Sequence, residues 1–425
     1  MREQFIEVLK KSGATHYLVR EVSRESYELY YVHKKIETAR YVDTLTTTVT
    51  IYKKVGNFLG SNSFYIYPST TVDEFKAMVE ASIKNAEANK DPLYSLVKNE
   101  RLEVESDSNF KDSSLKENAL NIAKAIFGVK HKKEASLNAT EIFVHRYNIH
   151  IFNSENLDKR EISYEAFVET IPTFTVGDDS VEIYESFHLG EFNEADIQKE
   201  IALKLNEVEA RYNAKKPEKA IENVSVMLRK AELTELFSEL TSELRYEVIY
   251  QQMNVISVGE RYQSSLEADS LTITMRGHMH GVYGSAYFDR SGSSLEDTKI
   301  IEVGEAINAF GDNKHAQFLK KKVTGNLSIV DVEGGSLKEE ELKDKKYLEC
   351  LSFSGIQVDI ANDYVGGEVR LALLHDGDKV EAVTGISIAA KLSDILNNMH
   401  LATEVTNGEY YHGPAFALFD GFTVL

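Results

Sequence analysis

The residues of this chain best spaced to hold a metal ion are two histidines, His278 and His280. On a β-strand, side chains two residues apart project to the same side, so both imidazole rings can reach one ion. A third ligand has to come from elsewhere, with Asp289 and His412 as candidates. Because two imidazoles alone satisfy neither the coordination number nor the supporting hydrogen bonds of a metal site, a polar strand edge is the favoured interpretation.

A second arrangement lies on a helix expected from Lys230 to Tyr250. One side of this helix is apolar and the other carries the glutamates Glu232, Glu235, Glu239 and Glu243. Glu239 and Glu243 stand four residues apart, which allows them to share a cation or to act as an acid/base pair. Charge runs of this kind usually form the solvated face of a helix, and that interpretation is favoured here.

Other common catalytic patterns are missing. No two of the 12 histidines stand at positions i and i+4, so the helical zinc motif with two imidazoles one turn apart is absent. The sequence has no G-x-S-x-G for a serine nucleophile and neither of the glycine-rich nucleotide-binding motifs. Cys350 stands in a strand-like alternation and is expected to be a buried apolar residue rather than a nucleophile. Residue chemistry alone therefore defines no active site.

The elements that position these residues are strands and amphipathic helices. The pair Thr71 and Glu74 predicts a capping box that opens a helix. In the longest period-two stretch, the threonines are expected on one face and the apolar residues on the other, with one of the two faces wet. The apolar residues are Tyr41, Leu45, Val49 and Ile51. Strands are expected at 15–20, 26–32, 36–52, 63–67, 141–152, 161–175 and 180–187, and helices at the N-terminus, 72–86, 113–127 and around 197–212.

A linker is expected at residues 213–219, Asn-Ala-Lys-Lys-Pro-Glu-Lys. It divides the chain into an N-terminal domain, 1–216, and a C-terminal domain, 217–425. The second domain is expected to open with a strand at 224–228 and the acidic helix, and to be mainly β beyond Val255, with one late helix at 388–399. The predicted fold class is α+β, with an N-terminal mixed sheet covered by helices and a mainly β C-terminal domain.

Composition narrows the function classes. The formal net charge is −20, and phosphate contacts are made by Lys and Arg, so nucleic-acid binding is disfavoured. A single cysteine excludes an internal disulfide. The N-terminal segment lacks an apolar signal core and no later stretch has the length of a membrane span, so we expect no membrane association and a cytoplasmic location.

Several C-terminal segments resemble those of the TldD/PmbA family, and they occur in the same order. Gly284 to Gly292 resembles its G-S/T-x-x-F-D-x-x-G segment. Val383 to Asp394 resembles V-x-G-x-T-I-A-G-N-L-x-D. Asp420 to Val424 matches the closing D-G-L-T-V. Residues 362–367, Asn-Asp-Tyr-Val-Gly-Gly, depart from the family's G-D-F-S, which puts a peptide groove at that place in question.

The resemblance implies a metallopeptidase-like fold and a role in proteolysis or peptide processing, in a family whose members are also named modulators of DNA gyrase. Active members carry H-E-x-x-x-H on the helix that starts the C-terminal domain. Here the motif falls on Ser238, Glu239 and Glu243, so both histidines are replaced. The family's thiolate ligand near the C-terminus has no counterpart in 410–414, Tyr-Tyr-His-Gly-Pro. No zinc is therefore expected in this chain, and zinc is expected in a partner subunit.

Three hypotheses follow. The favoured one is a non-catalytic, PmbA/TldE-like subunit that pairs with a motif-bearing TldD-like chain and helps to enclose unfolded peptides. A second is a stand-alone peptide-binding homodimer. A third is a metallopeptidase with unusual ligands drawn from Glu239, Glu243 and His278 or His280. Peptide-groove or weak metal candidates are His278, His280 and Asp289, and no catalytic residue is expected.

Overall fold

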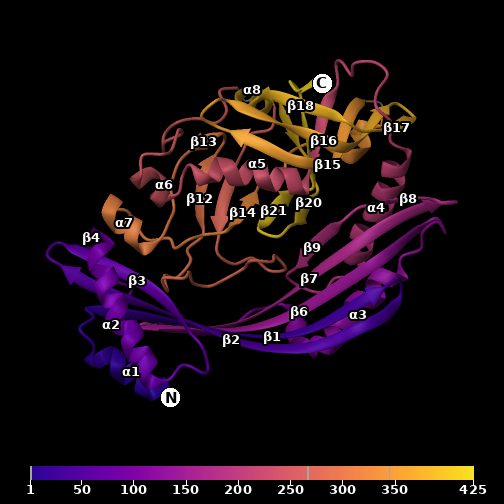
Figure 1. The fold of residues 1–425 in the computed structure, drawn as a ribbon. Coiled ribbons are helices and arrows are strands. Elements are labelled where there is room, and N and C mark those ends of the chain that lie inside the picture. The colour runs from indigo at the N-terminus through magenta and orange to yellow at the C-terminus, as the bar shows by residue number, and fades with distance from the viewer. Residues whose placement is uncertain (1, 266–267, 344) are drawn as a thin grey trace.

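The computed structural model describes residues 2–265, 268–343 and 345–425. Their strands form a nine-stranded sheet from the N-terminal half and sheets of eight and six strands from the C-terminal half. In Figure 1 the N-terminal sheet, coloured indigo to magenta, lies along one side of the C-terminal half, coloured orange to yellow. The fold is α+β, as predicted.

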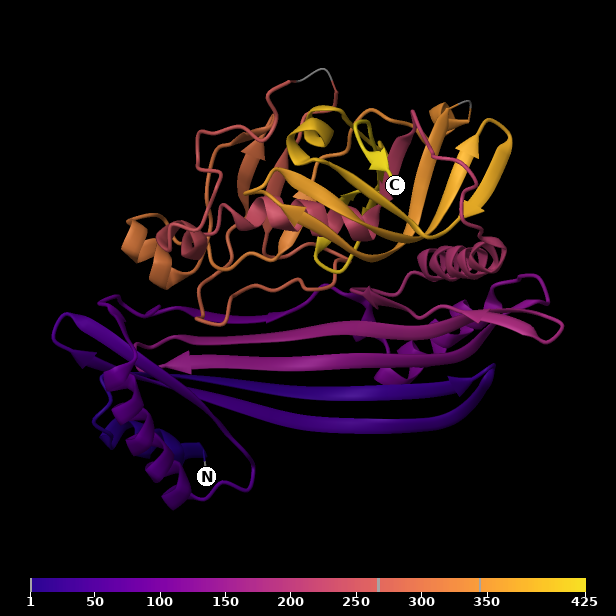
Figure 2. The same ribbon diagram turned by 45° about the horizontal axis from the view of Figure 1, so that its top comes forward.

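Four long antiparallel strands make up most of the N-terminal sheet, and Figure 2 shows them spanning its length. The strand order is β4-β3-β2-β1-β6-β7-β5, and β8 and β9 also pair with β7. The strands are β1 (His16–Val32), β2 (Lys35–Val55), β3 (Phe58–Ile66), β4 (Lys90–Pro92), β5 (Arg101–Glu105), β6 (Ala135–Asn153), β7 (Asp158–Val176), β8 (Asp179–Glu182) and β9 (Glu185–Leu189).

Two sequence predictions for this sheet need correction. The strands expected at 15–20 and 26–32 are one strand, β1, because the polar residues between them pair on both sides with β2 and β6. Of the predicted apolar face of β2, Val49 and Ile51 are buried, whereas Tyr41 and Leu45 are 58% and 49% exposed. In the described chain no strand pairs with the outer edge of β2 before Thr47, where its pairing with β3 begins. Alternation predicted the strand but not whether anything covers it.

Helices cover the two ends of the sheet. α1 (Arg2–Lys11) and α2 (Val72–Ala88) pack on β1 and β2 through a cluster that includes Phe75 and Val79. The predicted capping box is present, with the Glu74 N–H donating to Thr71 Oγ1 (3.3 Å) and the Thr71 N–H to Glu74 Oε2 (2.8 Å). α3 (Leu115–Gly128) and α4 (Glu194–Asn213) bury their isoleucines at the other end.

In the C-terminal half, α5 packs between the two sheets. Its leucines 233, 236 and 240, together with Leu244 just after the helix, are fully buried in a core that takes residues from both sheets. The sheet orders are β19-β22-β10-β15-β16-β18-β23, with β17 on β16, and β13-β12-β11-β14-β21-β20. The elements are β10 (Ser225–Arg229), α5 (Lys230–Ser242), α6 (Tyr246–Tyr250), β11 (Ile273–Arg276), β12 (Thr298–Glu302), β13 (Glu305–Ala306), α7 (Asn313–Leu319), β14 (Ile329–Val332), β15 (Lys346–Asp359), β16 (Tyr364–Asp376), β17 (Lys379–Val383), β18 (Ile386–Lys391), α8 (Leu392–Asn397), β19 (Met399–Leu401), β20 (Val405–Asn407), β21 (Tyr411–Pro414), β22 (Phe416–Phe419) and β23 (Thr423–Val424).

Two helices differ from the sequence prediction. The helix expected at 230–250 ends at Ser242, and a short second helix, α6, begins at Tyr246. The late helix expected at 388–399 is wrong in its first part, because residues up to Lys391 form β18 and only Leu392–Asn397 are helical. The alternating Ile386-Ser-Ile388 pattern pairs with β16 on one side and β23 on the other, so tertiary pairing decides the conformation.

α4 and the segment after it make one of the contacts between the two halves. Arg211 donates hydrogen bonds to the Arg370 carbonyl and the Thr384 hydroxyl, and Lys215 pairs with Val383. The boundary predicted at 216–217 falls in this segment, between α4 and β10. No helix in the described residues is long and apolar enough to cross a bilayer.

Candidate functional site

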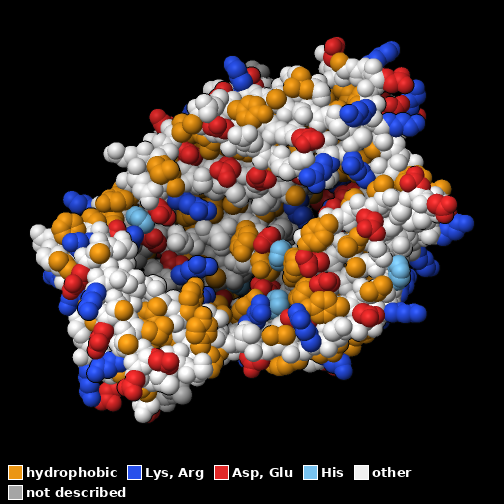
Figure 3. All heavy atoms as spheres, in the orientation of Figure 1, with side chains coloured by type: hydrophobic (Ala, Val, Ile, Leu, Met, Phe, Trp, Pro, Cys, Tyr) orange, Lys and Arg blue, Asp and Glu red, His pale blue; other side chains and the backbone are white. Residues whose placement is uncertain are grey.

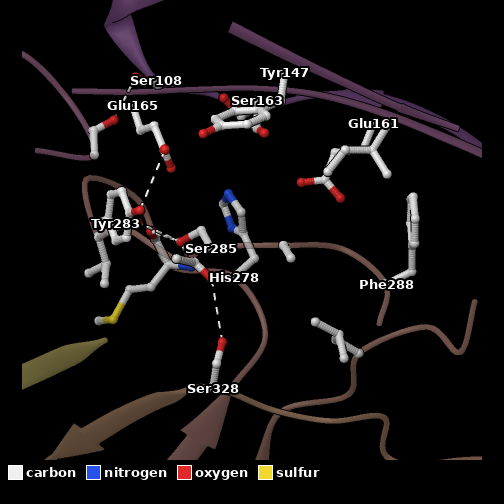
Figure 4. A pocket seen from close by; sticks show the side chains of 18 of the residues that line it. Ser108, Tyr147, Glu161, Ser163, Glu165, His278, Tyr283, Ser285, Phe288 and Ser328 are labelled. Atoms are coloured by element: carbon white, nitrogen blue, oxygen red, sulfur yellow. Dashed lines mark hydrogen bonds between the residues drawn. The ribbon is translucent and has the colours of Figure 1, made fainter. Parts of the chain in front are cut away.

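A cavity of about 470 Å³ lies where the N-terminal sheet meets the C-terminal half. One wall is the inner face of β1, β6 and β7, and the other is the loop between β11 and β12. Figure 3 shows the surface hollowed between the two halves, with charged side chains of both signs around the hollow. In Figure 4, Tyr147, Glu161 and Glu165 reach from the sheet toward the loop that carries His278 and Tyr283.

Strand register assembles the sheet wall. Val22 on β1 stands opposite Ile149 on β6, and Ile149 stands opposite Glu161 on β7. Tyr147, two residues before Ile149, is opposite Ser163. Because side chains alternate between the two faces of a strand, these residues share the face turned to the C-terminal half.

The facing loop is held in shape by hydrogen bonds and by close packing. Asp289 Oδ1 accepts from the Ser291 and Ser293 N–H groups at 2.8 and 3.0 Å, and Oδ2 accepts from the Asn326 N–H at 3.1 Å. Gly284 has φ +75°, and a Cβ atom there would lie 2.2 Å from the ring of Tyr410. Asp289, a candidate from the sequence, thus lines the cavity but is occupied in organising its wall.

Two carboxyl groups in the cavity have raised pKa values, which favour their neutral, protonated forms. Burial raises the pKa of Glu161 to about 7, although the Tyr287 N–H and Arg20 oppose the shift. Burial also raises the pKa of Glu165 to about 7, against hydrogen bonds from Tyr147 and Tyr283. Groups that titrate near neutral pH can both donate and accept hydrogen bonds, and such groups concentrate at functional sites.

The candidate histidines contact acidic residues, and His278 also lines the cavity. His278 Nε2 is 3.2 Å from Asp107 Oδ1, and the two ring nitrogens of His280 are 3.1 Å from Asp107 Oδ2 and from Glu191 Oε2. The prediction that they form a polar strand edge is wrong, because β11 ends at Arg276 and both histidines lie in the loop after it. Their contacts with Asp107 and Glu191 join this loop to the N-terminal half. Within the described ranges no three His, Cys, Asp or Glu side chains are grouped so as to hold a metal ion.

The positions aligned with H-E-x-x-x-H lie on α5 and at the residue that follows its end, Glu243, and none of them lines this cavity. Glu239 is exposed and Ser238 is half-buried. Glu243 is only 8% exposed, and its carboxylate accepts the N–H groups of Val255 and Ile256. The expectation of a solvated acidic face therefore holds for Glu235 and Glu239 but is wrong for Glu243, because the helix ends before it. It is also wrong for Glu232, which is half-buried and whose pKa burial raises to about 7.

The other candidate ligands are also engaged. His412 Nδ1 is 2.7 Å from Asp331 Oδ1, and Asp331 also pairs with Arg276. Cys350 is fully buried in β15, as expected, and burial raises the pKa of its thiol well above the usual range. A serine hydroxyl, a carboxylate bound to backbone and a buried thiol do not form the donor set of a zinc site. The α5 positions of this chain therefore do not fit the ion that active family members hold.

Most of the cavity residues were not predicted as site residues from the sequence. Arg20, Tyr147, Glu161 and Glu165 lie in strands that were predicted, but polar residues on a strand usually indicate a wet face. The available signal was Glu161-Ile-Ser-Tyr-Glu165, in which polar residues recur at a spacing of two. In the structure, the register of β1, β6 and β7 brings these polar residues together on one face, and this face meets the loop after β11.

Comparison with known proteins agrees with the motif order. Residues 221–425 match the family model described as the PmbA/TldA metallopeptidase C-terminal domain. The chain belongs to the TldD/PmbA family. The resemblance stated from its sequence motifs is thereby confirmed. A comparison with curated protein sequences found no match.

Solved structures of similar fold cover nearly the whole of the chain. TldE from Thermococcus kodakarensis has a TM-score of 0.80 at 16% identity, with 100% of this chain and 99% of that one covered. A candidate modulator of DNA gyrase from Thermotoga maritima has a TM-score of 0.76 at 14% identity, with both chains fully covered at 100%. Another from Bacteroides thetaiotaomicron has a TM-score of 0.77 at 16% identity, with 99% and 97% covered. At these identities the likeness shows the fold.

Proposed function

We propose that this TldD/PmbA family member is a non-catalytic, PmbA/TldE-like subunit of a peptide-processing metallopeptidase. It pairs with a related chain that carries H-E-x-x-x-H and binds the zinc ion, and it helps to enclose unfolded peptides. The observation that carries the proposal concerns the two ligand positions, which are Ser238 on α5 and Glu243 just after it. The Glu243 carboxylate accepts hydrogen bonds from the backbone of 255–256.

The chemistry of these groups supports a silent subunit. A neutral hydroxyl is a poor zinc ligand, and the Glu243 carboxylate would have to give up two backbone N–H groups to reach an ion. Glu239 occupies the position of the general base, but it is exposed and has no ligand set beside it to activate water.

The N-terminal sheet offers a surface for the partner. Residues 35–46 of β2 pair only with β1 in the described structure, so the other edge of this stretch is open. Its apolar side chains Ile36, Tyr41 and Leu45 are 50%, 58% and 49% exposed. An open strand edge with apolar residues favours pairing with another chain, and a partner with the same fold presents a matching edge.

The test is reconstitution with a motif-bearing chain from the same genome. Each subunit is purified alone, the two are mixed, and cleavage of an unfolded peptide is followed by mass spectrometry. We expect no cleavage by this chain with any added divalent metal, and faster cleavage in the mixture than by the partner alone, because enclosure fixes the scissile bond near the metal.

A negative control distinguishes a non-catalytic subunit from a chain whose active site could be restored by substitution. The double variant Ser238→His with Glu243→His restores the two imidazoles, and we expect it to remain inactive because the thiolate is still missing. Failure to bind any motif-bearing chain, together with a stable homodimer that binds peptide, would replace this proposal with the stand-alone hypothesis.

A further inference from the structure

Two guanidinium groups line the interdomain cavity without a bonded counter-charge. Arg20, on β1, and Arg290, in the facing loop, form no hydrogen bond or ion pair with other side chains of the described residues. Burial lowers the pKa of Arg20, and the nearby charge of Arg290 lowers it further. Like charges that share a partly desolvated space repel each other, so the pair favours a bound anion.

The acidic side chains of the cavity do not supply that anion. Asp289 accepts backbone N–H groups of its own loop, and Asp107 contacts His278 and His280. Glu161 is the carboxyl group that acts electrostatically on Arg20. Burial raises the pKa of Glu161 to about 7, so a large fraction of it is protonated and neutral near neutral pH. A ligand carboxylate can therefore bind to the guanidinium groups of Arg20 and Arg290 without breaking an existing ion pair.

The remaining walls suit a short peptide. The volume of about 470 Å³ falls within the range of roughly 300–1,000 Å³ usual for small-ligand sites. Apolar and aromatic side chains provide contact for a ligand side chain. The Ser106 hydroxyl lines the cavity too, is buried, and has no hydrogen-bond partner in the described chain. Since unsatisfied buried polar atoms are uncommon, this hydroxyl points to a ligand that hydrogen-bonds to it.

We propose that the cavity binds the free C-terminal end of a peptide, with its carboxylate held by Arg20 and Arg290. The planar guanidinium groups match a carboxylate with two parallel hydrogen bonds. Ser106, Glu161 and Glu165 then bond to the peptide backbone, and Tyr147, Tyr283 and Phe288 contact its last side chains. This inference rests on the proposed function for the nature of the ligand, an unfolded peptide, and adds which end of it this subunit recognises.

A peptide end fits better than a peptide interior. The backbone of an interior segment brings no negative charge, so both guanidinium groups would lose solvent without gaining a partner from it, which is costly. A terminal carboxylate supplies that charge, and its placement orients the rest of the peptide along the cavity.

The test measures binding to this chain alone by isothermal titration calorimetry. The probes are an N-acetylated four-residue peptide of alanine and phenylalanine with a free C-terminal carboxylate, and the same peptide as a C-terminal amide. We expect the acid to bind at least about tenfold more tightly, in line with the loss of a charge-assisted hydrogen-bonded pair. Arg20→Gln and Arg290→Gln each remove one positive charge and should each remove most of this preference for the acid.

The matched control is Arg160→Gln. Arg160 is exposed on β7 and alternates with Glu161, so it lies on the opposite face of the sheet. Its removal should leave the preference intact. Arg290 is exposed, so its variant keeps the fold even if the Arg20 variant loses stability, and melting curves check both.

Three results would overturn the inference: equal affinity for acid and amide, an equal loss of preference in Arg160→Gln, or displacement of the peptide by inorganic phosphate at the concentration of the peptide itself. The last result would identify a general anion site. Because no partner subunit is present, a failure here leaves the proposed pairing untouched, and a failure of pairing leaves this measurement unaffected.

Discussion

The carboxylate of Asp107, from the N-terminal half, lies 3.2 Å from the ring of His278, from the C-terminal half. Its second oxygen lies 3.1 Å from His280. Burial tends to raise the pKa of Asp107, but the two histidines outweigh it and hold the pKa below the usual range. The histidine pair that the sequence indicated as weak metal candidates therefore contacts the other half of the chain.

Asp107→Ala should weaken that contact. Partly exposed ion pairs contribute up to about 1 kcal/mol, so we expect the melting temperature at pH 6 to fall by about 1–2 °C. Asp43→Ala, at an exposed position of β2, serves as the control and should not shift it. An equal fall in melting temperature in both variants would mean that Asp107 acts only through the net charge of the chain and not through its contact with the histidines.

Glu161→Gln should change stability in a pH-dependent way. The folded pKa of about 7 lies above the ordinary 4.5, so the folded chain keeps a proton that the unfolded chain loses. Glu161 therefore contributes to stability at low pH, and that contribution is lost as pH rises from about 4.5 to 7. The variant should match the wild type at pH 4.5 and exceed it by about 2–3 kcal/mol at pH 8.

Urea unfolding at several pH values measures this difference. Glu103→Gln, on the adjacent strand β5 and exposed, removes the same charge outside the cavity and should show no such gain at high pH. A constant difference between Glu161→Gln and the wild type from pH 4.5 to 8 would show that the Glu161 carboxyl is not held neutral.

The sequence predicted elements better than their assembly. Thr71 and Glu74 located the start of α2, because a capping box is decided within four residues. The merger of two expected strands into β1, and the strand at Ile386–Lys391 in place of a helix, depend on pairing with distant strands. The same holds for the candidate site. His278 and Asp289 could be predicted from their residue types and motifs, whereas Arg20 and Glu161 come together only through the register of distant strands.

Glu243→Ala should be far more destabilising than Glu239→Ala. Loss of the Glu243 carboxylate leaves the N–H groups of Val255 and Ile256 without their acceptor, which costs about 2–3 kcal/mol. Glu239 is exposed, and its change should stay within about 0.5 kcal/mol. Urea unfolding of the two variants measures this contrast, and similar losses in both would contradict the placement of Glu243.

Leu45→Lys should impair assembly with the motif-bearing partner. A charge on the open edge of β2 opposes strand pairing, so we expect the dissociation constant to rise by at least about tenfold. Val380→Lys, at a position of β17 that is 53% exposed, is the matched control. Light scattering after size-exclusion chromatography reads the outcome, and an intact complex for Leu45→Lys would place the interface elsewhere.

The most direct measurement asks which chain supplies the catalytic glutamate. In the assembled pair, peptide cleavage is compared after Glu239→Ala in this chain and after the equivalent change in the H-E-x-x-x-H motif of the partner. We expect the first to keep cleavage within about twofold and the second to abolish it, since only the partner has the ligands to activate water. Chelator-sensitive cleavage by this chain alone, abolished by Glu239→Ala, would contradict the account.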